Sequence, residues 1–415
     1  MTLAERILAR ASGRKKVSPG EYVTAEIDKV MAHEAFAAVY MNLAAAGIRK
    51  IWDPDRVFVI LDHYIPASTP RAASIHQLVR AGAKQYGIMN IYRENEGIAH
   101  QVMMEKGNVL PGELVLGTDS HTCTYGALAA GSCGIGISEM TYVFATGRLW
   151  FQVPETIRFI LTGELAFPLT SKDVILKLAG EYSAEVAQYK SIEFSGPAAE
   201  KMDMSSRMTM TNMSVELGAK FSFFSVDEKT VDYLKGRTDS RISLLESDDK
   251  GSACQTYEVC LDDLEPQVAK PHSVDNVVPV SELKGTVIHQ ALLGSCTNGR
   301  LDDLHLAAEL IKGKTVHPDV RLLVIPASKE VYRSALEDGT LAVLLDAGGL
   351  ILNPGCGPCF GAHMGLLAPG EKCISSTNRN FKGRMGSDQA EVFLASPATV
   401  IASAIQGCIA DPRDM

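Results

Sequence analysis

Short apolar runs alternate along the chain with longer segments in which apolar residues recur at helical spacing. The runs have the length of buried strands. Helical spacing is clearest in residues 171–182 and 301–313. This alternation predicts an α/β protein whose sheets are mostly parallel.

Several predicted strands end in a turn rich in glycine, aspartate or asparagine, and each of these turns carries polar side chains. The five clearest are VFVILDHYIP (57–66), GELVLGTDSHT (112–122), TVIHQALLGSCTNGR (286–300), GLILNPGCGPC (349–359) and EKCISSTNRNFKGR (371–384). In parallel sheets, ligands bind beyond the carboxyl ends of the strands. We therefore expect these turns to meet at one shared site.

Breaks in the pattern predict three α/β domains around one cleft. The proline-rich segment 265–283 has little periodicity and is interpreted as a linker, and a weaker break falls near Val153–Pro154. The predicted domains are residues 1–155, which carry Asp/His motifs, residues 156–275, and residues 276–415, which carry the clustered cysteines discussed below.

Composition and charge narrow the classes of function. The 415 residues include 40 basic and 49 acidic side chains, a net charge of −9. This charge argues against a broad nucleic-acid-binding surface but allows a small anionic substrate. No apolar run approaches the ~18 residues of a membrane span. The basic, amphipathic start (1–16) fits an ordinary first helix better than a transit peptide. We therefore expect a cytoplasmic protein, and we expect no membrane partner.

The cysteines are the first candidates for chemistry. The chain has nine, an odd number without the pattern of a disulfide framework, so we expect reduced thiols. Cys356 and Cys359 form a C-x-x-C pair in a turn of glycines and proline, which can point both sulfurs the same way. Such a pair can be half of a zinc site, a redox dithiol or inert, but a second close pair and a thioredoxin-like unit are missing.

Cys296, in the glycine-bounded turn GSCTNGR, is the third candidate ligand. Three thiolates are one fewer than the four that usually hold an iron–sulfur cluster, which leaves one iron open as a Lewis acid. The alternative is a thiol nucleophile at Cys296, with His121 as its base and Asp119 as the orienting group. That alternative predicts a colourless transferase without iron.

Two aspartate–histidine pairs follow predicted strands. In the motif TDSH, an extended chain places Asp119 and His121 on one side and the intervening serine on the other, which suits a general acid–base pair. Asp62 and His63 form the second pair, and His100 in EGIAHQ adds a third imidazole. A single histidine is often structural, but two such pairs at strand ends favour catalysis.

The segment SSTNRNFKGRMG (375–386) gathers side chains that can bind an anion: Asn378, Arg379, Asn380, Lys382 and Arg384. Arginine binds carboxylates bidentately, so Arg379, between asparagines after an apolar strand, is the strongest candidate. The glycines of GSCGIGISEM (131–140) do not form a dinucleotide-binding loop, because Glu139 stands where its third glycine belongs.

Five motifs, in order across nearly the whole chain, resemble the aconitase superfamily, and within it the large subunits of the 3-isopropylmalate dehydratase and homoaconitase group. They are GTDSHTCTYGAL, TMTNMSVELGA, LLGSCTNGR, NPGCGPC and STNRNFKGRMG. The resemblance implies three α/β domains around a central iron–sulfur cleft, an aconitase-like fold without the family's swivelling domain.

The resemblance also implies roles for individual residues. A [4Fe–4S] cluster is expected on three ligands, with one iron open to substrate: Cys296, Cys356 and Cys359. Catalytic residues are expected around the departing or entering water: Asp62, His63, His100, Asp119, His121 and Glu216. Binding residues are expected beside the cluster and at the substrate carboxylates: Asn212, Asn298, Asn378, Arg379 and Arg384.

The implied reaction is dehydration of a 2-hydroxy di- or tricarboxylate and rehydration at the neighbouring carbon. Isomerisation between 3-isopropylmalate and 2-isopropylmalate is the leading prediction, and homoaconitase, 2-methylmalate and 2,3-dimethylmalate dehydratase large subunits are the alternatives. The sequence GRMG (383–386) resembles the isopropylmalate group. Cys133 in GSCG and the missing glycine pair before residues 193–194 depart from the family pattern, away from the predicted cluster ligands.

The chain stops at Met415, ahead of the family's swivelling domain, which brings a serine base and a substrate-selecting loop. We therefore expect a separate small subunit, in a heterodimer or heterotetramer. Some relatives bind RNA when their cluster is lost, and the acidic charge of this chain weighs against that role.

Overall fold

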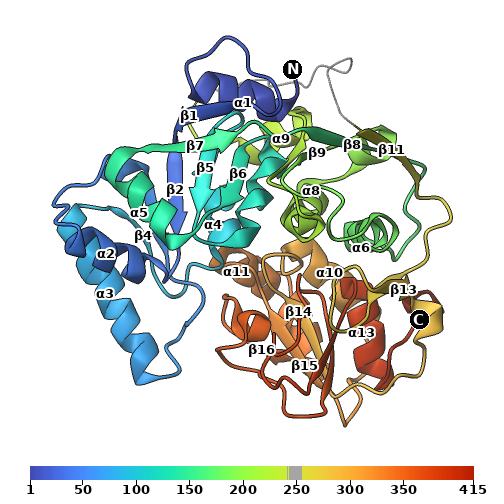
Figure 1. The fold of residues 1–415 in the computed structure, drawn as a ribbon. Coiled ribbons are helices and arrows are strands. Elements are labelled where there is room, and N and C mark those ends of the chain that lie inside the picture. Colours follow the sequence, from blue (N-terminus) through green and yellow to red (C-terminus); the bar gives the residue numbers. More distant parts are fainter. Residues whose placement is uncertain (241, 243–254) are drawn as a thin grey trace.

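The computed structural model describes residues 1–240, 242 and 255–415, so Cys254 lies outside the described residues. The strands form three large sheets and one small ribbon, with helices packed around them (Figure 1). Most strand pairs are parallel, so the prediction of an α/β protein with mostly parallel sheets is confirmed. The described part of the chain contains no helix with the length and apolar character that spanning a membrane requires.

The first sheet has five parallel strands in the order β4-β3-β2-β5-β6. They are β2 (Lys29–Ala32), β3 (Val57–Ile60), β4 (Asn90–Tyr92), β5 (Leu114–Gly117) and β6 (Gly131–Gly134). Its helices are α1 (Leu3–Ala11), α2 (Phe36–Ala45), α3 (Pro70–Tyr86), α4 (Ala99–Glu105) and α5 (Ile137–Thr146). An antiparallel ribbon pairs β1 (Tyr22–Glu26) with β7 (Arg148–Gln152). Strands such as β3, buried at every position, need cover on both faces, which the helices supply.

The second sheet has four parallel strands in the order β10-β9-β8-β11. They are β8 (Thr156–Thr162), β9 (Ser191–Ser195), β10 (Phe221–Phe224) and β11 (Gln255–Cys260). Its helices are α6 (Ser171–Tyr182), α7 (Pro197–Lys201), α8 (Met204–Met213) and α9 (Glu228–Leu234).

The third sheet has seven strands in the order β13-β12-β18-β17-β14-β15-β16. They are β12 (Gln267–Ala269), β13 (Val277–Pro279), β14 (Gln290–Gly294), β15 (Arg321–Ile325), β16 (Leu350–Ile351), β17 (Lys372–Ser375) and β18 (Glu391–Leu394). All pairs are parallel except those that β12 makes with β13 and β18. Its helices are α10 (Leu301–Ile311), α11 (Lys329–Glu337), α12 (Thr340–Asp346) and α13 (Pro397–Gln406).

Short 3₁₀ helices occupy several of the connections between these elements. They are η1 (Pro54–Arg56), η2 (Ser120–Leu128), η3 (Ser214–Leu217), η4 (Val280–Glu282), η5 (Gly357–Phe360) and η6 (Pro412–Asp414). Three of them, η2, η3 and η5, carry residues of the predicted site.

The basic start of the chain forms α1, so the prediction of an ordinary first helix is confirmed. Thr2 and Glu5 form a capping box that satisfies backbone donors at its first turn. Leu3, Ile7 and Leu8 are buried in the core beside the first sheet.

The interpretation of residues 265–283 as a linker is wrong, because this segment contains β12 and β13 of the third sheet. Proline removes a hydrogen-bond donor from a strand and so favours loops, but an edge strand tolerates it. β13, which ends in Pro279, is the edge strand here. The third sheet thus begins before residue 276, and the division into domains 1–155, 156–275 and 276–415 stays a prediction.

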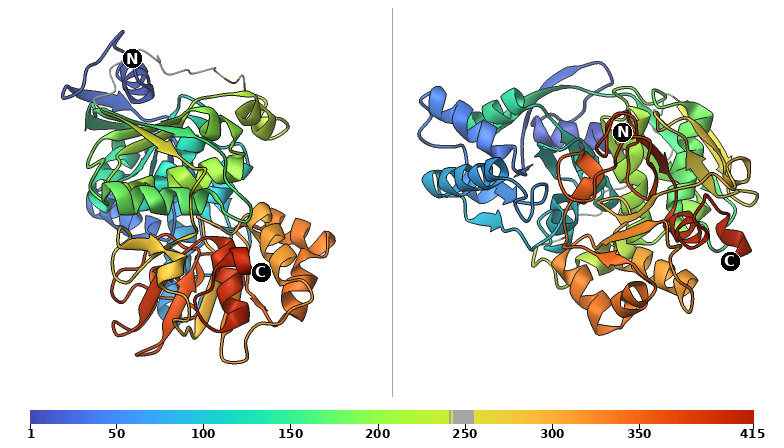
Figure 2. Two further views of the ribbon diagram at one scale, coloured as in Figure 1. Left: turned by 90° about the vertical axis from the view of Figure 1, so that its right-hand side faces the viewer. Right: turned by 90° about the horizontal axis from the view of Figure 1, so that it is seen from below.

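The third sheet and its helices lie on one side of the first two sheets, as the orange and red ribbon in Figures 1 and 2 shows. The interiors are continuous across the sheets. Phe221 and Phe223 of β10 pack in the core of the first sheet, and Leu292 and Leu394 of the third sheet share a core with the second. This packing holds the ends of strands from all three sheets against one another.

Candidate active site

The residues predicted to form the site lie on separate segments of the chain, several of which directly follow a strand, and these segments face one another. They are residues 62–63 after β3, 100 in α4, 119–121 after β5, 212 in α8, 216 in η3, 296–298 after β14, 356–359 around η5, and 378–384 after β17. The contacts described below connect these segments through side chains.

Asn378 links two of the three predicted ligand cysteines. Its Nδ2 donates to Cys296 Sγ at 3.3 Å, and its Oδ1 accepts from Cys359 Sγ at 3.7 Å. Cys356 Sγ lies 3.8 Å from Asp62 Oδ2 and 3.8 Å from the neighbouring histidine's Nδ1. The structure thus places Cys356 beside the Asp62–His63 pair.

The three sulfurs do not all lie within reach of a single ion in the described structure. In the described part of the chain, they do not belong to a set of ligand atoms that all lie within 4.8 Å of one another. A zinc–sulfur bond is about 2.3 Å long, so two sulfurs on one zinc ion lie at most about 4.6 Å apart. As the side chains stand, the three sulfurs are therefore not arranged to bind one zinc ion together.

Two of the three thiols, those of Cys296 and Cys356, are protonated in the metal-free chain. Burial raises the pKa of Cys296 to about 12, with Cys359 adding to the rise. Burial also raises the pKa of Cys356 well above its usual range, and Asp62, Cys296 and Cys359 add to this rise. A metal centre therefore displaces protons when it takes these thiols as thiolate ligands.

Two tight turns bring the cysteines close to the opposing strand β15. Gly357 has φ +54°, and a Cβ there would lie 2.3 Å from Ile325 Cδ1. In the other turn Gly294 has φ +153°, and a Cβ there would lie 2.7 Å from Ile325 O. Ser295 has φ +72°, a left-handed conformation that is unfavourable for a residue with a side chain. Such local strain is typical of functional loops.

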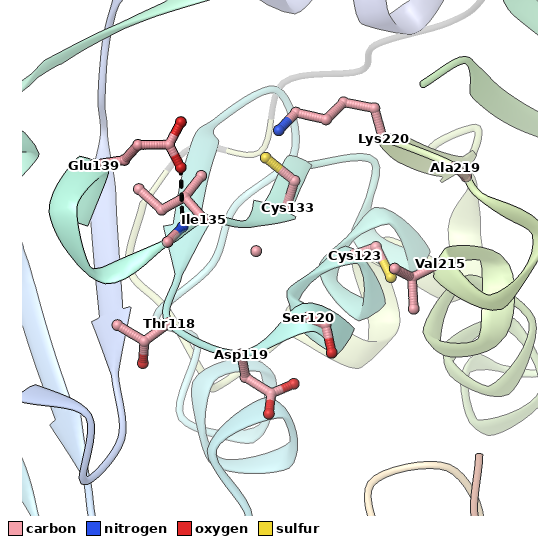
Figure 3. Close-up of a pocket in the computed structure, with 12 residues that line it drawn as sticks. Thr118, Asp119, Ser120, Cys123, Cys133, Ile135, Glu139, Val215, Ala219 and Lys220 are labelled. Carbon is pink, nitrogen blue, oxygen red and sulfur yellow. Dashed lines mark hydrogen bonds between the residues drawn. The ribbon is translucent and has the colours of Figure 1, made fainter. Parts of the chain in front are cut away.

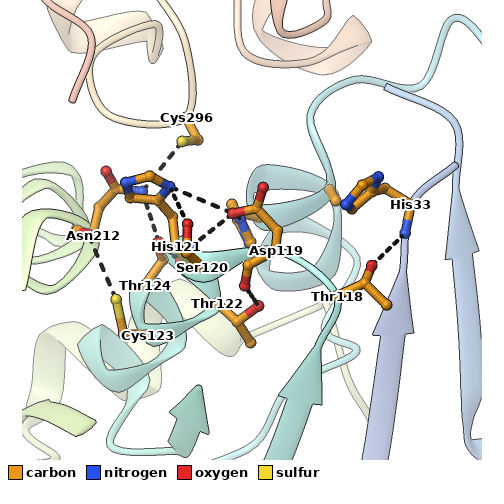
Figure 4. A network of polar contacts seen from close by, with 12 residues as sticks. His33, Thr118, Asp119, Ser120, His121, Thr122, Cys123, Thr124, Asn212 and Cys296 are labelled. Atoms are coloured by element: carbon orange, nitrogen blue, oxygen red, sulfur yellow. Dashed lines mark hydrogen bonds and ion pairs between the residues drawn. The ribbon is translucent and has the colours of Figure 1, made fainter. Parts of the chain in front are cut away.

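Asn212 is the second donor to Cys296, with Nδ2 3.3 Å from Sγ (Figure 4). Thr297 Oγ1 donates to Asn212 Oδ1 at 2.9 Å, and Asn212 Nδ2 also donates to Thr124 Oγ1 at 2.9 Å. These bonds fix the amide so that its nitrogen faces the sulfur. Hydrogen bonds to ligand sulfurs tune iron–sulfur centres.

Asn298 is held differently from the other two asparagines. Its Nδ2 donates to Asp303 Oδ1 at 2.9 Å and to Thr209 Oγ1 at 3.3 Å. Its Oδ1 is buried without a hydrogen-bond partner among the described residues. No contact in that part of the chain joins Asn298 to a cysteine, so its binding role stays a prediction.

His63 lies in a strongly acidic environment. Its Nδ1 is 2.6 Å from Asp62 Oδ1, its backbone N–H donates to Glu34 Oε1 at 3.0 Å, and its ring stacks on His33 with centroids 4.2 Å apart. Burial alone lowers the pKa of His63, but Asp62, Glu34 and Asp119 outweigh it and raise the pKa to about 10. The imidazole is therefore protonated at neutral pH and can act as a general acid.

Asp119 is the centre of a second network. His100 Nε2 lies 2.9 Å from Asp119 Oδ1, and the backbone N–H of His121 donates to the same oxygen at 2.7 Å. Burial raises the pKa of Asp119, but the two histidines outweigh it and hold the pKa well below its usual range. His63 Nε2 is 3.7 Å from Asp119 Oδ2, which joins the two networks.

The expectation that the serine of TDSH points away from His121 is wrong. Residues 120–128 form the 3₁₀ helix η2 rather than an extended chain, so side chains at i and i+2 do not share one face. Ser120 Oγ lies 3.5 Å from His121 Nδ1, and Asp119 Oδ1 lies 3.4 Å from the same nitrogen (Figure 4). Asp119 still orients His121, but as the residue that caps η2.

Glu216 connects His121 to the predicted carboxylate-binding arginine. His121 Nε2 is 2.8 Å from Glu216 Oε1, and Arg379 Nε donates to the same oxygen at 2.7 Å. Burial raises the pKa of Glu216, but His121 and Arg379 outweigh it and lower the pKa below its usual value. Glu216 is therefore an ionised acceptor that holds both neighbours in place.

The other residues of the 378–384 segment divide into two groups. Arg384 Nη2 lies 4.0 Å from Cys359 Sγ, and its buried Nε has no hydrogen-bond partner among the described residues. Asn380 instead donates to the backbone of Lys270 and Ser273, and Lys382 is exposed. Arg384 is thus available to an anion at the cysteines, whereas Asn380 and Lys382 are not directed there.

His33 and Glu34 belong to the same site but were not among the predicted residues. Glu34 Oε1 accepts the backbone N–H groups of His63 and Tyr64, each at 3.0 Å. Its other oxygen is buried without a hydrogen-bond partner in the described residues, 3.7 Å from His33 Nδ1 and 3.8 Å from His63 Nδ1. His33 and Glu34 directly follow β2, so the rule of polar residues at strand ends applied to them as well.

A separate cavity of about 490 Å³ borders the back of the Asp119 loop (Figure 3). Cys133 and Lys220 line it, while the Asp119 carboxylate and Ser120 hydroxyl point away from them. None of the predicted ligand cysteines lines this cavity. The unusual cysteine of GSCG thus lies apart from the proposed metal site.

Comparison with known proteins gives a consistent family. The sequence matches the model of the aconitase family (aconitate hydratase) over residues 5–287 and 281–407. It is 49% identical over 416 residues to the probable 3-isopropylmalate dehydratase large subunit of Methanothermobacter thermautotrophicus, covering 100% of this chain and 99% of that protein. It is 47% identical over 418 residues to the probable methanogen homoaconitase large subunit of the same organism, covering 100% and 98%. The 3-isopropylmalate dehydratase large subunit of Aquifex aeolicus is 44% identical over 421 residues, covering 100% and 98%.

Among solved structures, the holo-form of aconitase X from Thermococcus kodakaraensis is similar in fold, with a TM-score of 0.51 and 12% sequence identity. The match covers 86% of this chain and 84% of that one. At this identity the similarity supports the expected fold only.

Proposed function

Because the chain belongs to the aconitase family, a family of hydro-lyases whose members depend on an iron–sulfur cluster, we propose that it is the large subunit of 3-isopropylmalate dehydratase. The reaction would dehydrate 3-isopropylmalate and rehydrate the product as 2-isopropylmalate, or the reverse. The 49% identity to a probable 3-isopropylmalate dehydratase large subunit over the whole chain supports this substrate. The 47% identity to a probable homoaconitase large subunit makes homoaconitate chemistry the second candidate, ahead of 2-methylmalate and 2,3-dimethylmalate.

The single observation that supports this proposal best is the position of Asn378, whose amide is hydrogen-bonded to both Cys296 and Cys359. We propose a [4Fe–4S] cluster with these two cysteines and Cys356 as its ligands. The residues fit the group: the three thiols are soft donors, two of them are joined through Asn378, and amide N–H groups face Cys296. When bound, the cluster supplies a Lewis acid that polarises the substrate's hydroxyl and carboxylate.

The chain's own residues supply the acid and the substrate clamp. Elimination breaks the C–O bond of the substrate hydroxyl, and the leaving oxygen takes up a proton to become water. His63, protonated at neutral pH and paired with Asp62, is the proposed donor of that proton. His63 Nε2 lies 3.7 Å from Asp119 Oδ2, so an ionised carboxylate hydrogen-bonded to His100 favours the protonated form of His63.

Arg379 and Arg384 are the proposed carboxylate ligands. Arg379 uses Nε for Glu216 and no described residue bonds its terminal nitrogens, so these can bind a carboxylate. Arg384 Nε is buried without a partner in the described residues, next to Cys359. Glu216, paired with His121, holds Arg379 in place. His121 Nδ1 lies 3.4 Å from Asp119 Oδ1, so the substrate-binding arginine is connected to the histidine network.

We propose that a small subunit completes the site. Elimination also needs a base at the carbon-bound proton, and the resemblance assigns a serine of the swivelling domain to that step. The relatives matched over their whole length are themselves named large subunits. The partner would close the cleft, exclude water and select the substrate side chain, in a heterodimer or heterotetramer that works in the cytoplasm.

The cysteine-nucleophile alternative is less well supported. A nucleophilic cysteine needs a lowered pKa and an adjacent base. Burial raises the pKa of Cys296 instead, and its described side-chain partners are two asparagine amides rather than a histidine.

The test is an anaerobic assay of this chain with its small subunit on 3-isopropylmalate and on homoaconitate, with iron and acid-labile sulfide measured on the same sample. The proposal expects four iron per chain at full loading and a kcat/KM at least tenfold higher for 3-isopropylmalate. A preference for homoaconitate would move the assignment to the second candidate, and turnover of 3-isopropylmalate by an iron-free complex would refute the cluster.

A further inference from the structure

Lys172, in the first turn of α6, is a charged side chain with 0% exposure behind the cysteines. Its Nζ donates to Ser376 O at 2.9 Å and also to Thr377 O. In the described part of the chain no carboxylate forms an ion pair with this ammonium group, and its hydrogen-bond acceptors are these two neutral carbonyls. A buried charge without an anionic partner is costly, so a partner is expected nearby.

The nearest carboxyls are poor counter-ions because other groups already hold them. Asp173 accepts the backbone N–H groups of Thr170 at 2.9 Å and Gln267 at 3.1 Å. Asp303 accepts from Asn298 at 2.9 Å and from a backbone N–H at 2.9 Å. Burial raises the pKa of Asp173 and of Asp303 to about 6 in each case, so both are mostly ionised at neutral pH, but their oxygens are occupied by these other donors.

The ligand cysteines are the stronger source of negative charge. Burial lowers the pKa of Lys172 to about 7, and the leading charges that oppose this effect are those of Cys359 and Cys296. As metal ligands they are thiolates at every working pH.

Lys172 also controls the position of Asn378. Its two carbonyl acceptors belong to the residues directly before Asn378, whose amide contacts both Cys296 and Cys359. α6 packs against β8 of the second sheet and also against β12 and β13 of the third, and the turn follows β17 of the third. The ammonium therefore ties the turn to the first turn of α6.

We propose that Lys172 is the buried counter-cation of the iron–sulfur centre and the positioning residue of the Asn378 turn. Its ammonium offsets the negative charge of the ligated cysteines and fixes the backbone that aims Asn378 at their sulfurs. This inference rests on the proposed ligation by Cys296, Cys356 and Cys359. A fixed cation close to the centre stabilises its reduced, more negative form and so raises the reduction potential.

The test is a potentiometric titration of the centre in the holo complex of wild type, Lys172→Gln, Lys172→Met and Lys172→Arg. Lys172→Gln and Lys172→Met remove the charge and are expected to disfavour the reduced form of the centre. The equilibrium should shift at least tenfold toward the oxidised form, which lowers the reduction potential by ~59 mV for a one-electron couple. Lys172→Arg keeps the charge and is expected to stay within a threefold shift. The matched control is Lys220→Gln, which removes a partly buried lysine beside Cys133, away from the ligand cysteines, and is expected to leave the potential unchanged.

A merely structural role would lower thermal stability or iron content without moving the potential, so an unchanged potential in iron-loaded Lys172→Gln and Lys172→Met would overturn the proposal. Wild-type NMR with ¹³Cε-labelled lysine provides a second measurement that needs no folded charge-removing variant. A buried lysine signal close to the paramagnetic centre is expected to remain protonated up to pH 9 in the holo complex. Titration of that signal near pH 7 in the holo complex would also overturn it. A wild-type complex without iron would instead refute the ligation on which the inference rests.

Discussion

Arg379 Nε donates to Glu216 Oε1 at 2.7 Å, which turns the guanidinium so that its terminal nitrogens are available to another carboxylate. The same oxygen of Glu216 lies 2.8 Å from His121 Nε2. The proposed substrate clamp and the histidine network are thus joined through one atom.

The first prediction concerns the bidentate fork of Arg379. Arg379→Lys keeps the charge but cannot bond Glu216 and a substrate carboxylate in the same way. A hydrogen bond to a charged group contributes about 1.5–3 kcal/mol, so kcat/KM is expected to fall about ten- to a hundredfold while the iron content stays unchanged. Steady-state kinetics on the complex measure this. Lys382→Ala, an exposed cation of the same segment, serves as the control, and an equal loss in both variants would argue against a specific role for Arg379.

The second prediction separates ligand cysteines from the rest. Cys296→Ser, Cys356→Ser and Cys359→Ser are each expected to abolish the stable cluster, because serine oxygen is a hard, poor substitute for thiolate. Visible absorbance and iron content under anaerobic conditions measure this. Cys123→Ser, Cys133→Ser, Cys260→Ser, Cys373→Ser and Cys408→Ser are expected to remain brown, as is Cys254→Ser. A colourless protein from any of these controls, with the fold intact, would show that the ligand set is misassigned.

The third prediction concerns the pH dependence of stability in the metal-free chain. The pKa of His63 is about 10 in the folded protein and about 6.5 when unfolded. A raised pKa means that the folded state binds more protons than the unfolded state between these values. The stabilisation is therefore complete below about pH 6.5 and is lost as the pH rises toward 10, with a slope of at most about 1.4 kcal/mol per pH unit.

Thermal unfolding of wild type and His63→Asn between pH 6 and 10 measures this contribution. The melting temperature of wild type is expected to fall more steeply over this range than that of the variant. The control is His317→Asn, which removes a partly exposed histidine between α10 and β15. Parallel curves for wild type and His63→Asn would show that the Asp62–His63 pair is not protonated as described.

The fourth prediction concerns the division of labour between subunits. The isolated chain is expected to bind iron but to turn over substrate at least 10² times more slowly than the complex, since positioned proton transfer contributes about 10²–10⁴-fold. Adding the small subunit should restore the rate, and exchanging it for that of a homoaconitase should change the preferred substrate. Full activity of the isolated chain, with its cluster and without a copurifying partner, would exclude the two-subunit mechanism.

Much of this site was predictable because its chemistry lies at the ends of parallel strands. Asp62, Asp119 and Cys296 each follow a fully buried strand, Cys356 follows the short, partly exposed strand β16, and the topology of α/β sheets brings such ends together. The fold class followed from the same alternation. The roles within the site, including the ligand set, came from the resemblance of the motifs rather than from the pattern.

Other features depended on three-dimensional contacts that the pattern does not encode. Lys172 lies in an ordinary amphipathic helix by sequence, and only its reach to the turn after β17 reveals its position behind the cysteines. The orientation of the serine in TDSH was predicted wrongly because residues 120–128 form a 3₁₀ helix rather than an extended chain. The prolines of 265–283 indicated a linker because the sequence does not show that β13 is an edge strand.

The most direct test of the central claim is made on the complex of this chain with its small subunit, purified without oxygen. Conversion of 3-isopropylmalate to 2-isopropylmalate is followed by NMR while the cluster absorbance is recorded on the same sample during stepwise oxidation. The proposed function predicts that activity and visible absorbance decline together, and that iron and sulfide under reducing conditions restore both. Undiminished conversion after the absorbance is lost would contradict it.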